Sequence, residues 1–371
     1  MPYSTQHLLI GSIDPYSGKS TVVLALAQAL IQKGVDLAYG KPIGTCPEPG
    51  VSCNLDGDVQ FLTKTLKLSP DRLCPTLVWA DPSNLEQRLA HKDTEDYAAQ
   101  FAQSMFAQSM LAPPTGGNES TLVLLEGPGT LDEGILYGLS LPEMATIVDA
   151  GIVLVTRLKS YLPLESLIAA KKRLGHRLLG VILNDIHPSQ QITVDQVIKP
   201  YLEEQEIPVL GVLPHSEILK SVSVGELVTR LGAEVLCSAD RMDLMVENLC
   251  IGAMNVNSAL EYFRRGRNMA IVTGGDRTDL QLAAMETSTQ CLILTGHIPP
   301  VPSIVSRAEE LEIPILSVDL DTLSTVEIIE QTLGQVRLHE GIKLDCVFEM
   351  GQTFLQIDRL LTFLKPTQKT L

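Results

Sequence analysis

Runs of apolar residues with few polar interruptions constrain the fold of this chain more than any other feature of its sequence. These runs occupy residues 7–13, 121–125, 152–156, 178–183 and 209–213. A strand without polar alternation is typical of burial on both faces, and such burial is found in parallel sheets that helices cover on each side. Amphipathic segments lie between the runs, the first at residues 19–33. The first half of the chain therefore predicts an α/β fold with a doubly wound, mostly parallel sheet.

The alternation of strands and helices pauses near residues 215–221 and then returns on a smaller scale. Short apolar runs follow at residues 270–273, 291–295 and 315–318. A helix is predicted to open at Ser223, because Glu226 completes a capping box with it. With 371 residues, 45% of them hydrophobic, the chain is large enough for two cores. We therefore predict two domains, residues 1–217 and a smaller α/β domain at residues 218–371.

The charge and the cysteines exclude several classes of partner. The 44 acidic and 28 basic residues give a formal net charge of −16, and such a field repels nucleic-acid backbones. The seven cysteines form no C-x-x-C pair, which favours reduced thiols over a disulfide framework or a zinc site. The N-terminus shows no signal-peptide pattern, and no apolar stretch is long enough to span a bilayer. We expect a cytoplasmic protein with no nucleic-acid and no membrane partner.

A glycine-rich loop between the first apolar run and the first helix is typical of phosphate binding. Backbone N–H groups of such a loop cradle phosphate, Lys19 neutralises the outer phosphates, and Ser20 can hold Mg²⁺. The residues that we assign to the cofactor here are Asp14, Ser17, Gly18, Lys19, Ser20 and Thr21. Ile13 stands where the usual G-x-x-x-x-G-K-[ST] pattern has its first glycine. The alternative is a structural turn that contains Gly-Lys-Ser by chance.

Further polar residues follow other predicted strands, at the sheet edge where ligands bind in this architecture. Asp58 and Glu126 offer carboxylates that can hold Mg²⁺ or orient its water. Lys41 ends the second strand and is predicted to point into the ligand crevice, and the amide of Asn184 can read an adenine edge. The alternatives are a helix cap for Asp58, turn positions for Glu126 and Asn184, and a solvated Lys41.

These motifs together resemble the dethiobiotin synthetase-like group of ATP-binding proteins, and above all the N-terminal domain of long phosphate acetyltransferases. The resemblance lies in residues 14–20, 41–42, 56–59, 126–129, 180–184 and 211–214. It implies that the cofactors are ATP and Mg²⁺, with Lys19 on the phosphates and Ser20, Asp58 and Glu126 on the metal. It assigns Asn184 and Pro214 to the nucleotide, and it makes Lys19 and Lys41 the catalytic candidates.

The sequence departs from the synthetases at Ser12, where that group carries glycine. This difference argues against ligase chemistry more than against nucleotide binding.

The second half resembles the DRTGG domain, which long phosphate acetyltransferases and some regulatory pyrophosphatases contain. The match centres on Gly274, Gly275, Asp276 and Arg277, and it covers most of residues 220–340. A turn rich in backbone amides can hold an anion, with Asp276 or Thr278 capping the helix behind it. The alternative is a structural turn or an interface element, which we favour over a ligand site. The resemblance implies regulation and dimer contacts for this domain.

Three functions are compatible with these features. We prefer an ATP- and Mg²⁺-binding regulatory or scaffold protein with, at most, slow ATPase activity. The alternatives are an ATP-dependent ligase of the dethiobiotin synthetase or cobyrinate amidation type, acting on a small carboxylate, and a regulatory subunit of a separate enzyme. In long phosphate acetyltransferases a catalytic domain follows these two, and the residues past 340 are too few to build it. We therefore expect no phosphate acetyltransferase activity from this chain by itself.

Self-association is also predicted. Met254, Val256, Tyr262 and Phe263 lie around the start of one helix in the second half. A small α/β domain often covers an apolar patch or an open sheet edge by pairing with a second copy. We therefore expect a homodimer that forms through residues 220–371.

Overall fold

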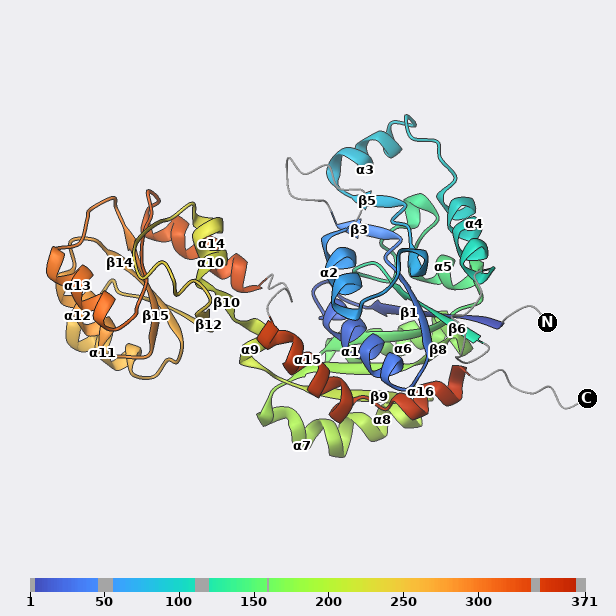
Figure 1. The fold of residues 1–371 in the computed structure, drawn as a ribbon. Coiled ribbons are helices and arrows are strands. Elements are labelled where there is room, and N and C mark those ends of the chain that lie inside the picture. The colour runs from blue at the N-terminus through green and yellow to red at the C-terminus, as the bar shows by residue number, and fades with distance from the viewer. Residues whose placement is uncertain (1–3, 46–55, 111–119, 159, 335–340, 365–371) are drawn as a thin grey trace, which may run out of the picture. The chain divides into compact units, whose positions relative to one another are not determined.

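A computed structural model describes residues 4–45, 56–110, 120–158, 160–334 and 341–364 of the chain. The chain divides into two compact units, which Figure 1 shows as separate sheets with their own helices. The first unit holds residues 1–215 and 344–371, and the second holds residues 216–343. Within the described ranges, no helix combines the length and the apolar character that crossing a membrane requires.

The first unit is built on a seven-stranded sheet with the strand order β4-β2-β6-β1-β7-β8-β9. Its strands are β1 (Ser4–Ser12), β2 (Asp36–Gly40), β4 (Leu73–Cys74), β6 (Ser120–Glu126), β7 (Gly151–Arg157), β8 (Leu178–Ile186) and β9 (Val209–Pro214). Every neighbouring pair in this sheet is parallel. Leu9 and Leu125 face one core, and their neighbours Leu8 and Leu124, which point to the opposite face, are also fully buried. The predicted parallel sheet, buried on both faces, is confirmed.

Helices cover this sheet and connect its strands. They are α1 (Lys19–Gln32), α2 (Gly57–Leu66), α3 (Pro82–Leu89), α4 (Tyr97–Ser109), α5 (Leu141–Ile147), α6 (Leu162–Leu174), α7 (Gln191–Thr193) and α8 (Lys199–Glu204). A small second sheet pairs β3 (Ile43–Thr45) with β5 (Val78–Ala80). Because all strands of this sheet run in the same direction, the carboxyl ends of β1, β6, β7, β8 and β9 meet at one edge of the sheet.

The last helices of the chain are α15 (Gly341–Phe354) and α16 (Ile357–Leu364). From residue 344 onward they group with the first unit, which differs from the predicted range of 218–371 for the second domain. Arg359 makes a two-point ion pair with Glu203, with both N···O distances at 2.7 Å, and the N–H of Gln356 donates to the carbonyl of Leu210 at 2.7 Å. No local sequence pattern says which sheet these helices cover.

The second unit contains a five-stranded mixed sheet with the order β11-β16-β15-β14-β13. Its strands are β11 (Glu234–Cys237), β13 (Asn248–Ile251), β14 (Met269–Gly274), β15 (Thr289–Thr295) and β16 (Ile315–Ser317), of which β11 alone runs antiparallel to its neighbour. Strands β10 (Val222–Ser223) and β12 (Met245–Val246) form a short pair, and the helices are α9 (Glu217–Lys220), α10 (Val224–Leu231), α11 (Val256–Phe263), α12 (Thr278–Met285), α13 (Pro302–Glu310) and α14 (Thr322–Gly334).

The four apolar residues predicted to lie around a helix start extend from just before α11 to its last residue, Phe263, and they are mostly core. Phe263 is fully buried, and Met254 and Val256 pack against the same cluster. Tyr262 alone among these four residues is largely exposed, at 54%. The four residues therefore do not form one exposed apolar patch, because α11 turns most of them toward its own sheet.

Candidate functional site

The loop between β1 and α1 leads into the N-terminus of the first helix. Gly18 occupies the N-cap with φ at 86°, a left-handed conformation that favours glycine, and its neighbour Tyr16 also has positive φ at 56°. Among the residues that the structure describes, no side chain makes a capping hydrogen bond here, and the first turn of α1 carries no acidic residue. The first N–H groups of α1 are thus left for an anion, and the helix dipole favours one there.

Lys19 opens α1 and is held by a hydroxyl group instead of a carboxylate. Its Nζ donates to Ser12 Oγ at 3.0 Å, and Ser12 Oγ donates to the carbonyl of Gly129 at 2.6 Å. Burial lowers the pKa of Lys19, and the charges of Glu126 and Glu133 oppose that effect. A phosphate group brought next to this ammonium would meet a cation that is fixed in place but not neutralised by direct contact with a carboxylate.

Glu126, the last residue of β6, lies beside the first turn of α1. Ser20 Oγ donates to Glu126 Oε1 at 2.9 Å, and the hydroxyl of Tyr39 donates to Glu126 Oε2 at 3.0 Å. Burial, followed by the charge of Glu126, holds the pKa of Tyr39 well above its usual value, so Tyr39 stays a donor. The Ser20 hydroxyl oxygen and the Glu126 carboxylate oxygen are ligands of the kind that Mg²⁺ binds.

These two oxygens fit a magnesium ion that takes its remaining ligands from phosphate and water. Among the residues that the structure describes, no group of three or more His, Cys, Asp and Glu side chains is arranged to hold a metal. Mg²⁺ commonly binds through one or two protein oxygens together with substrate phosphates and waters. The donor set therefore fits a cation that arrives with a nucleotide.

Lys41 lies in a buried ion-pair cluster. Its Nζ is 3.1 Å from Asp56 Oδ2 and 2.9 Å from Asp58 Oδ2, and the residue is 6% exposed. Burial lowers the pKa of Lys41, but the charges of Glu126, Asp58 and Asp56 outweigh burial and raise it overall. Asp56 also caps α2 by accepting the N–H of Asp58. The structure thus places Asp58 on Lys41, while Ser20 and Glu126 contact each other.

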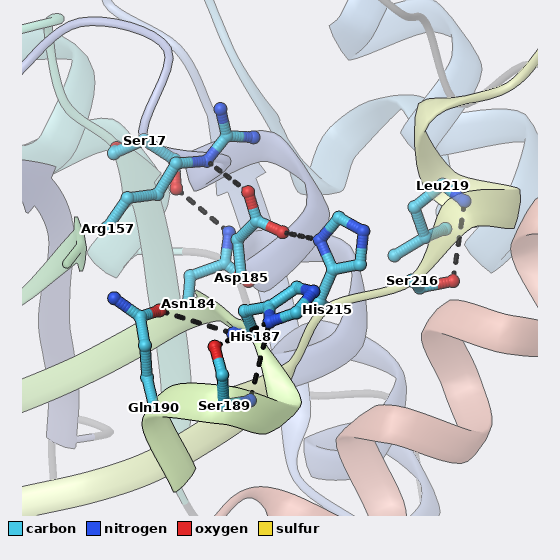
Figure 2. Close-up of polar contacts among 10 residues, drawn as sticks. All are labelled: Ser17, Arg157, Asn184, Asp185, His187, Ser189, Gln190, His215, Ser216 and Leu219. Carbon is cyan, nitrogen blue, oxygen red and sulfur yellow. Dashed lines mark hydrogen bonds and ion pairs between the residues drawn. The ribbon is translucent and has the colours of Figure 1, made fainter. Parts of the chain in front are cut away.

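Asn184 reaches the phosphate loop from β8. Its Nδ2 donates to the carbonyl of Ser17 at 2.9 Å, and a Cβ added to Gly18 would lie only 2.2 Å from that nitrogen. Figure 2 shows this contact together with the neighbouring strand ends. Ser17 Oγ is buried and, within the described ranges, has no hydrogen-bond partner. A buried hydroxyl that lacks a partner is costly unless a ligand or water supplies one.

The remaining predicted cofactor residues lie around this loop. Asp14 is exposed within it, Thr21 lies in the first turn of α1, and Pro214 ends β9 opposite Ile186. The structure therefore brings the phosphate loop, Glu126 and Asn184 together.

Sequence reasoning missed three residues that lie at the ends of β7, β8 and β9. Arg157 ends β7, Asp185 follows Asn184, and His215 follows Pro214. Asp185 lies between the other two, as Figure 2 shows. Their position after apolar strands was a signal in the sequence, but their mutual contact depends on the strand order.

The turn after β14 in the second unit is held by the protein itself. Gln281 Nε2 donates to the carbonyls of Gly274 and Gly275 at 2.9 and 3.1 Å, and Arg277 Nη2 donates to the carbonyl of Met254 at 3.0 Å. Arg277 occupies the N-cap of α12 without a side-chain cap. The prediction that Asp276 or Thr278 caps this helix is therefore wrong, and the contacts favour a structural or interface role for the turn.

Comparison with known proteins agrees with this architecture. Residues 6–223 match the AAA domain, and residues 226–332 match the DRTGG domain. The phosphate acetyltransferase of Synechocystis sp. is 24% identical over 378 residues, which cover 97% of this chain and 52% of that protein. The phosphate acetyltransferase of Nitratidesulfovibrio vulgaris is 22% identical over 391 residues, which cover 96% of this chain and 51% of that protein. The chain thus spans about half the length of the curated relatives that it matches.

Among solved structures, the MinD cell division protein of Aquifex aeolicus matches at 12% identity with a TM-score of 0.36, covering 57% of this chain and 83% of that chain. The resemblance to the first two domains of long phosphate acetyltransferases is confirmed by the two domain matches and by the curated relatives. The chain belongs to the AAA domain family through its phosphate-loop domain, which a DRTGG domain follows.

Proposed function

We propose that this chain binds ATP with Mg²⁺ at the phosphate loop and acts as a regulatory or scaffold protein, with slow ATPase activity at most. The arrangement of Lys19 carries the proposal. Its ammonium is fixed by the Ser12 hydroxyl at the uncapped N-terminus of α1, and the Ser20–Glu126 pair lies in the same turn. These groups are the cation, the amide donors and the oxygen ligands that a magnesium nucleotide needs.

Each residue has a distinct role in this proposal. Lys19 binds the outer phosphates, and the loop that surrounds them contains the buried Ser17 hydroxyl, which has no hydrogen-bond partner among the described residues. Ser20 and Glu126 hold the cation, with Asp58 close enough for its charge to act on Tyr39. A bound Mg²⁺ would neutralise phosphate charge. Asn184 fixes the loop through Ser17 and contacts the base, next to Pro214.

The surroundings of Lys41 support a regulatory role over the ligase alternative. A ligase that acts on a small carboxylate needs a cation free to bind that carboxylate. The ammonium of Lys41 already has Asp56 and Asp58 within 3.1 Å. An anionic substrate would therefore meet two carboxylates at this position, and like charges at this range repel.

Isothermal calorimetry of the wild-type chain with ATP, with and without Mg²⁺, tests the proposal directly. We expect binding that Mg²⁺ strengthens. Absence of heat with any nucleoside triphosphate, in a chain that melts cooperatively, would refute nucleotide binding. Phosphate release that a small carboxylate stimulates would instead favour the ligase.

Replacing Glu126 with glutamine should weaken the magnesium dependence of binding. Loss of the carboxylate charge removes one ligand, so we expect about a tenfold higher Mg²⁺ requirement. Asp58→Asn should have a smaller effect, about threefold, because Asp58 also holds Lys41. The measurement is a Mg²⁺ titration at fixed ATP.

Asp149→Asn is the matched control, since Asp149 is an exposed carboxylate that pairs with Arg177 away from the site. If Glu126→Gln titrates like Asp149→Asn, Glu126 serves the fold and not the metal.

We also propose that the DRTGG unit pairs with a second copy of itself. Strand β13 forms an open edge of its sheet, where Ile251 is 37% exposed, and Tyr262 lies exposed on the next helix. An open edge with apolar side chains favours pairing.

Light scattering of the full chain should give twice the chain mass, and Tyr262→Glu should lower the measured mass. Tyr161→Glu, on an exposed tyrosine of the first unit, should not. A wild-type chain with the mass of one copy would end this proposal.

A further inference from the structure

Three polar side chains lie across the phosphate loop from the proposed metal site. In the sheet, β1 lies between β6 and β7. Glu126, on β6, contacts Ser20 on one side of the loop. Arg157, Asp185 and His215 follow the strands on the other side, β7, β8 and β9. If the outer phosphates and Mg²⁺ lie toward β6, the nucleoside end of the same molecule extends toward β7, β8 and β9.

Asp185 holds its two neighbours by separate oxygens. Its Oδ1 is 2.6 Å from His215 Nδ1, and its Oδ2 is 3.5 Å from Arg157 Nε. The backbone N–H of His215 also donates to the carbonyl of Ile186 at 2.8 Å, which holds the main chain of His215 beside the end of β8. Figure 2 shows the carboxylate of Asp185 directed to both partners. Asp185 therefore sets the direction of both side chains.

The guanidinium group of Arg157 adjoins the phosphate loop itself. Its Nη2 would lie 3.9 Å from a Cβ added to Gly18, next to the Asn184 amide that contacts Ser17. The side chain of Arg157 is 28% exposed, so the group is partly open to an incoming molecule. The planar face of a guanidinium is suited to stacking on an aromatic base, and its N–H groups can donate to base or ribose oxygens and nitrogens.

Two features of this cluster cost free energy of folding when no ligand is bound. Asp185 has φ at 62°, which is uncommon for a residue other than glycine. Arg157 Nε is buried and, within the described ranges, lacks a hydrogen-bond acceptor, because the Asp185 oxygen at 3.5 Å is too far for one. Strained backbone and unsatisfied donors gather at ligand sites, where binding depends on them.

We propose that Arg157, positioned by Asp185, contacts the nucleoside part of the bound nucleotide. The proposal rests on nucleotide binding at the phosphate loop and adds the residue that distinguishes a nucleotide from a bare polyphosphate. Asp185 is a positioning residue, since Arg157 and His215 occupy its two oxygens in the absence of a nucleotide.

The test compares ATP with inorganic triphosphate as calorimetric ligands of the full chain, both with Mg²⁺. Wild type binds ATP more tightly than triphosphate. Arg157→Ala lowers the ATP affinity by about tenfold and changes the triphosphate affinity by less than about twofold. Asp185→Asn shows the same selective loss. The retained triphosphate affinity demonstrates that the variants are folded.

Arg177→Ala is the matched control. Arg177 also pairs with an aspartate, Asp149 at 2.7 Å, but it lies just before β8 begins, at the opposite end of the strand from Asp185. Arg177→Ala leaves both affinities unchanged. Equal losses for ATP and triphosphate in Arg157→Ala, or no loss for either, overturn the nucleoside contact while leaving nucleotide binding in place. A wild-type chain that binds neither ligand overturns the proposed function itself.

Discussion

Replacing Lys19 with alanine is expected to reduce ATP affinity by a factor on the order of 100 or more. The ammonium lies at the N-terminus of α1, held by a neutral hydroxyl at 3.0 Å. Each hydrogen bond that involves a charged group contributes about 1.5–3 kcal/mol, so the loss of two phosphate contacts amounts to about 3–6 kcal/mol. Burial lowers the pKa of Lys19, which disfavours its charged form. The negative charge of a bound phosphate opposes this effect and favours the charged ammonium. Calorimetry with ATP and Mg²⁺ measures the difference.

Lys33→Ala supplies the control on the same helix. Lys33 follows the C-terminal end of α1, is about half exposed, and pairs with Asp358 at 2.7 Å. Its removal changes the net charge by the same amount and should leave ATP binding unchanged. If Lys19→Ala binds ATP as tightly as Lys33→Ala does, the loop is a structural turn and the Gly-Lys-Ser sequence has no role in phosphate binding.

The parallel sheet and the phosphate loop could be predicted because their causes are local. Apolar runs without alternation require burial on both faces, whatever the strand order is. A loop between such a strand and an amphipathic helix presents free N–H groups wherever the strand lies in the sheet. The positions of Lys19 and Ser20 at the start of α1 follow from sequence spacing alone.

Contacts between strand ends could not be predicted in this way. Lys41 and Asp58 were assigned separate roles, as a catalytic candidate and a metal ligand, yet they form one ion pair at 2.9 Å. The pairing brings the start of α2 to the end of β2, and no periodic pattern in the sequence encodes that approach. Arg157, Asp185 and His215 were missed for the same reason, since their approach requires β7, β8 and β9 to be neighbours.

Ser12 shows how a departure from a family pattern can be explained by structure. As a sequence feature it counted against ligase chemistry. In the fold its hydroxyl oxygen accepts a hydrogen bond from the Lys19 ammonium, and its O–H donates to the carbonyl of Gly129. A glycine at this position could not make either contact. Serine in place of glycine therefore gives Lys19 a fixed position in the absence of nucleotide. A fixed ammonium is compatible with the proposed nucleotide binding.

Replacing Gly275 with alanine should destabilise the DRTGG unit by about 3 kcal/mol, which is a large part of the stability of a small domain. A Cβ at this position would lie 1.8 Å from the carbonyl oxygen of Ile298 and 2.8 Å from its carbonyl carbon. Both are backbone atoms, so relief requires the chain at residue 298 to move away from the turn. The turn cannot yield easily either, because Gln281 ties both glycine carbonyls and the N–H of Gly275 donates to Thr295.

Gly274→Ala is the matched comparison one residue earlier. The nearest atom to its added Cβ is Asp276 Oδ1 at 2.5 Å, the end of an exposed side chain that can rotate away. We expect a loss below about 1 kcal/mol for that variant. Because two units need not unfold together, amide hydrogen exchange in β14 and β15 is the measurement that localises the effect. Faster exchange in Gly275→Ala than in Gly274→Ala identifies Gly275 as the position where only glycine allows the backbone of residue 298 to approach the turn this closely. Equal exchange would mean that the chain around Ile298 moves freely, and the turn would then be open enough to admit a ligand.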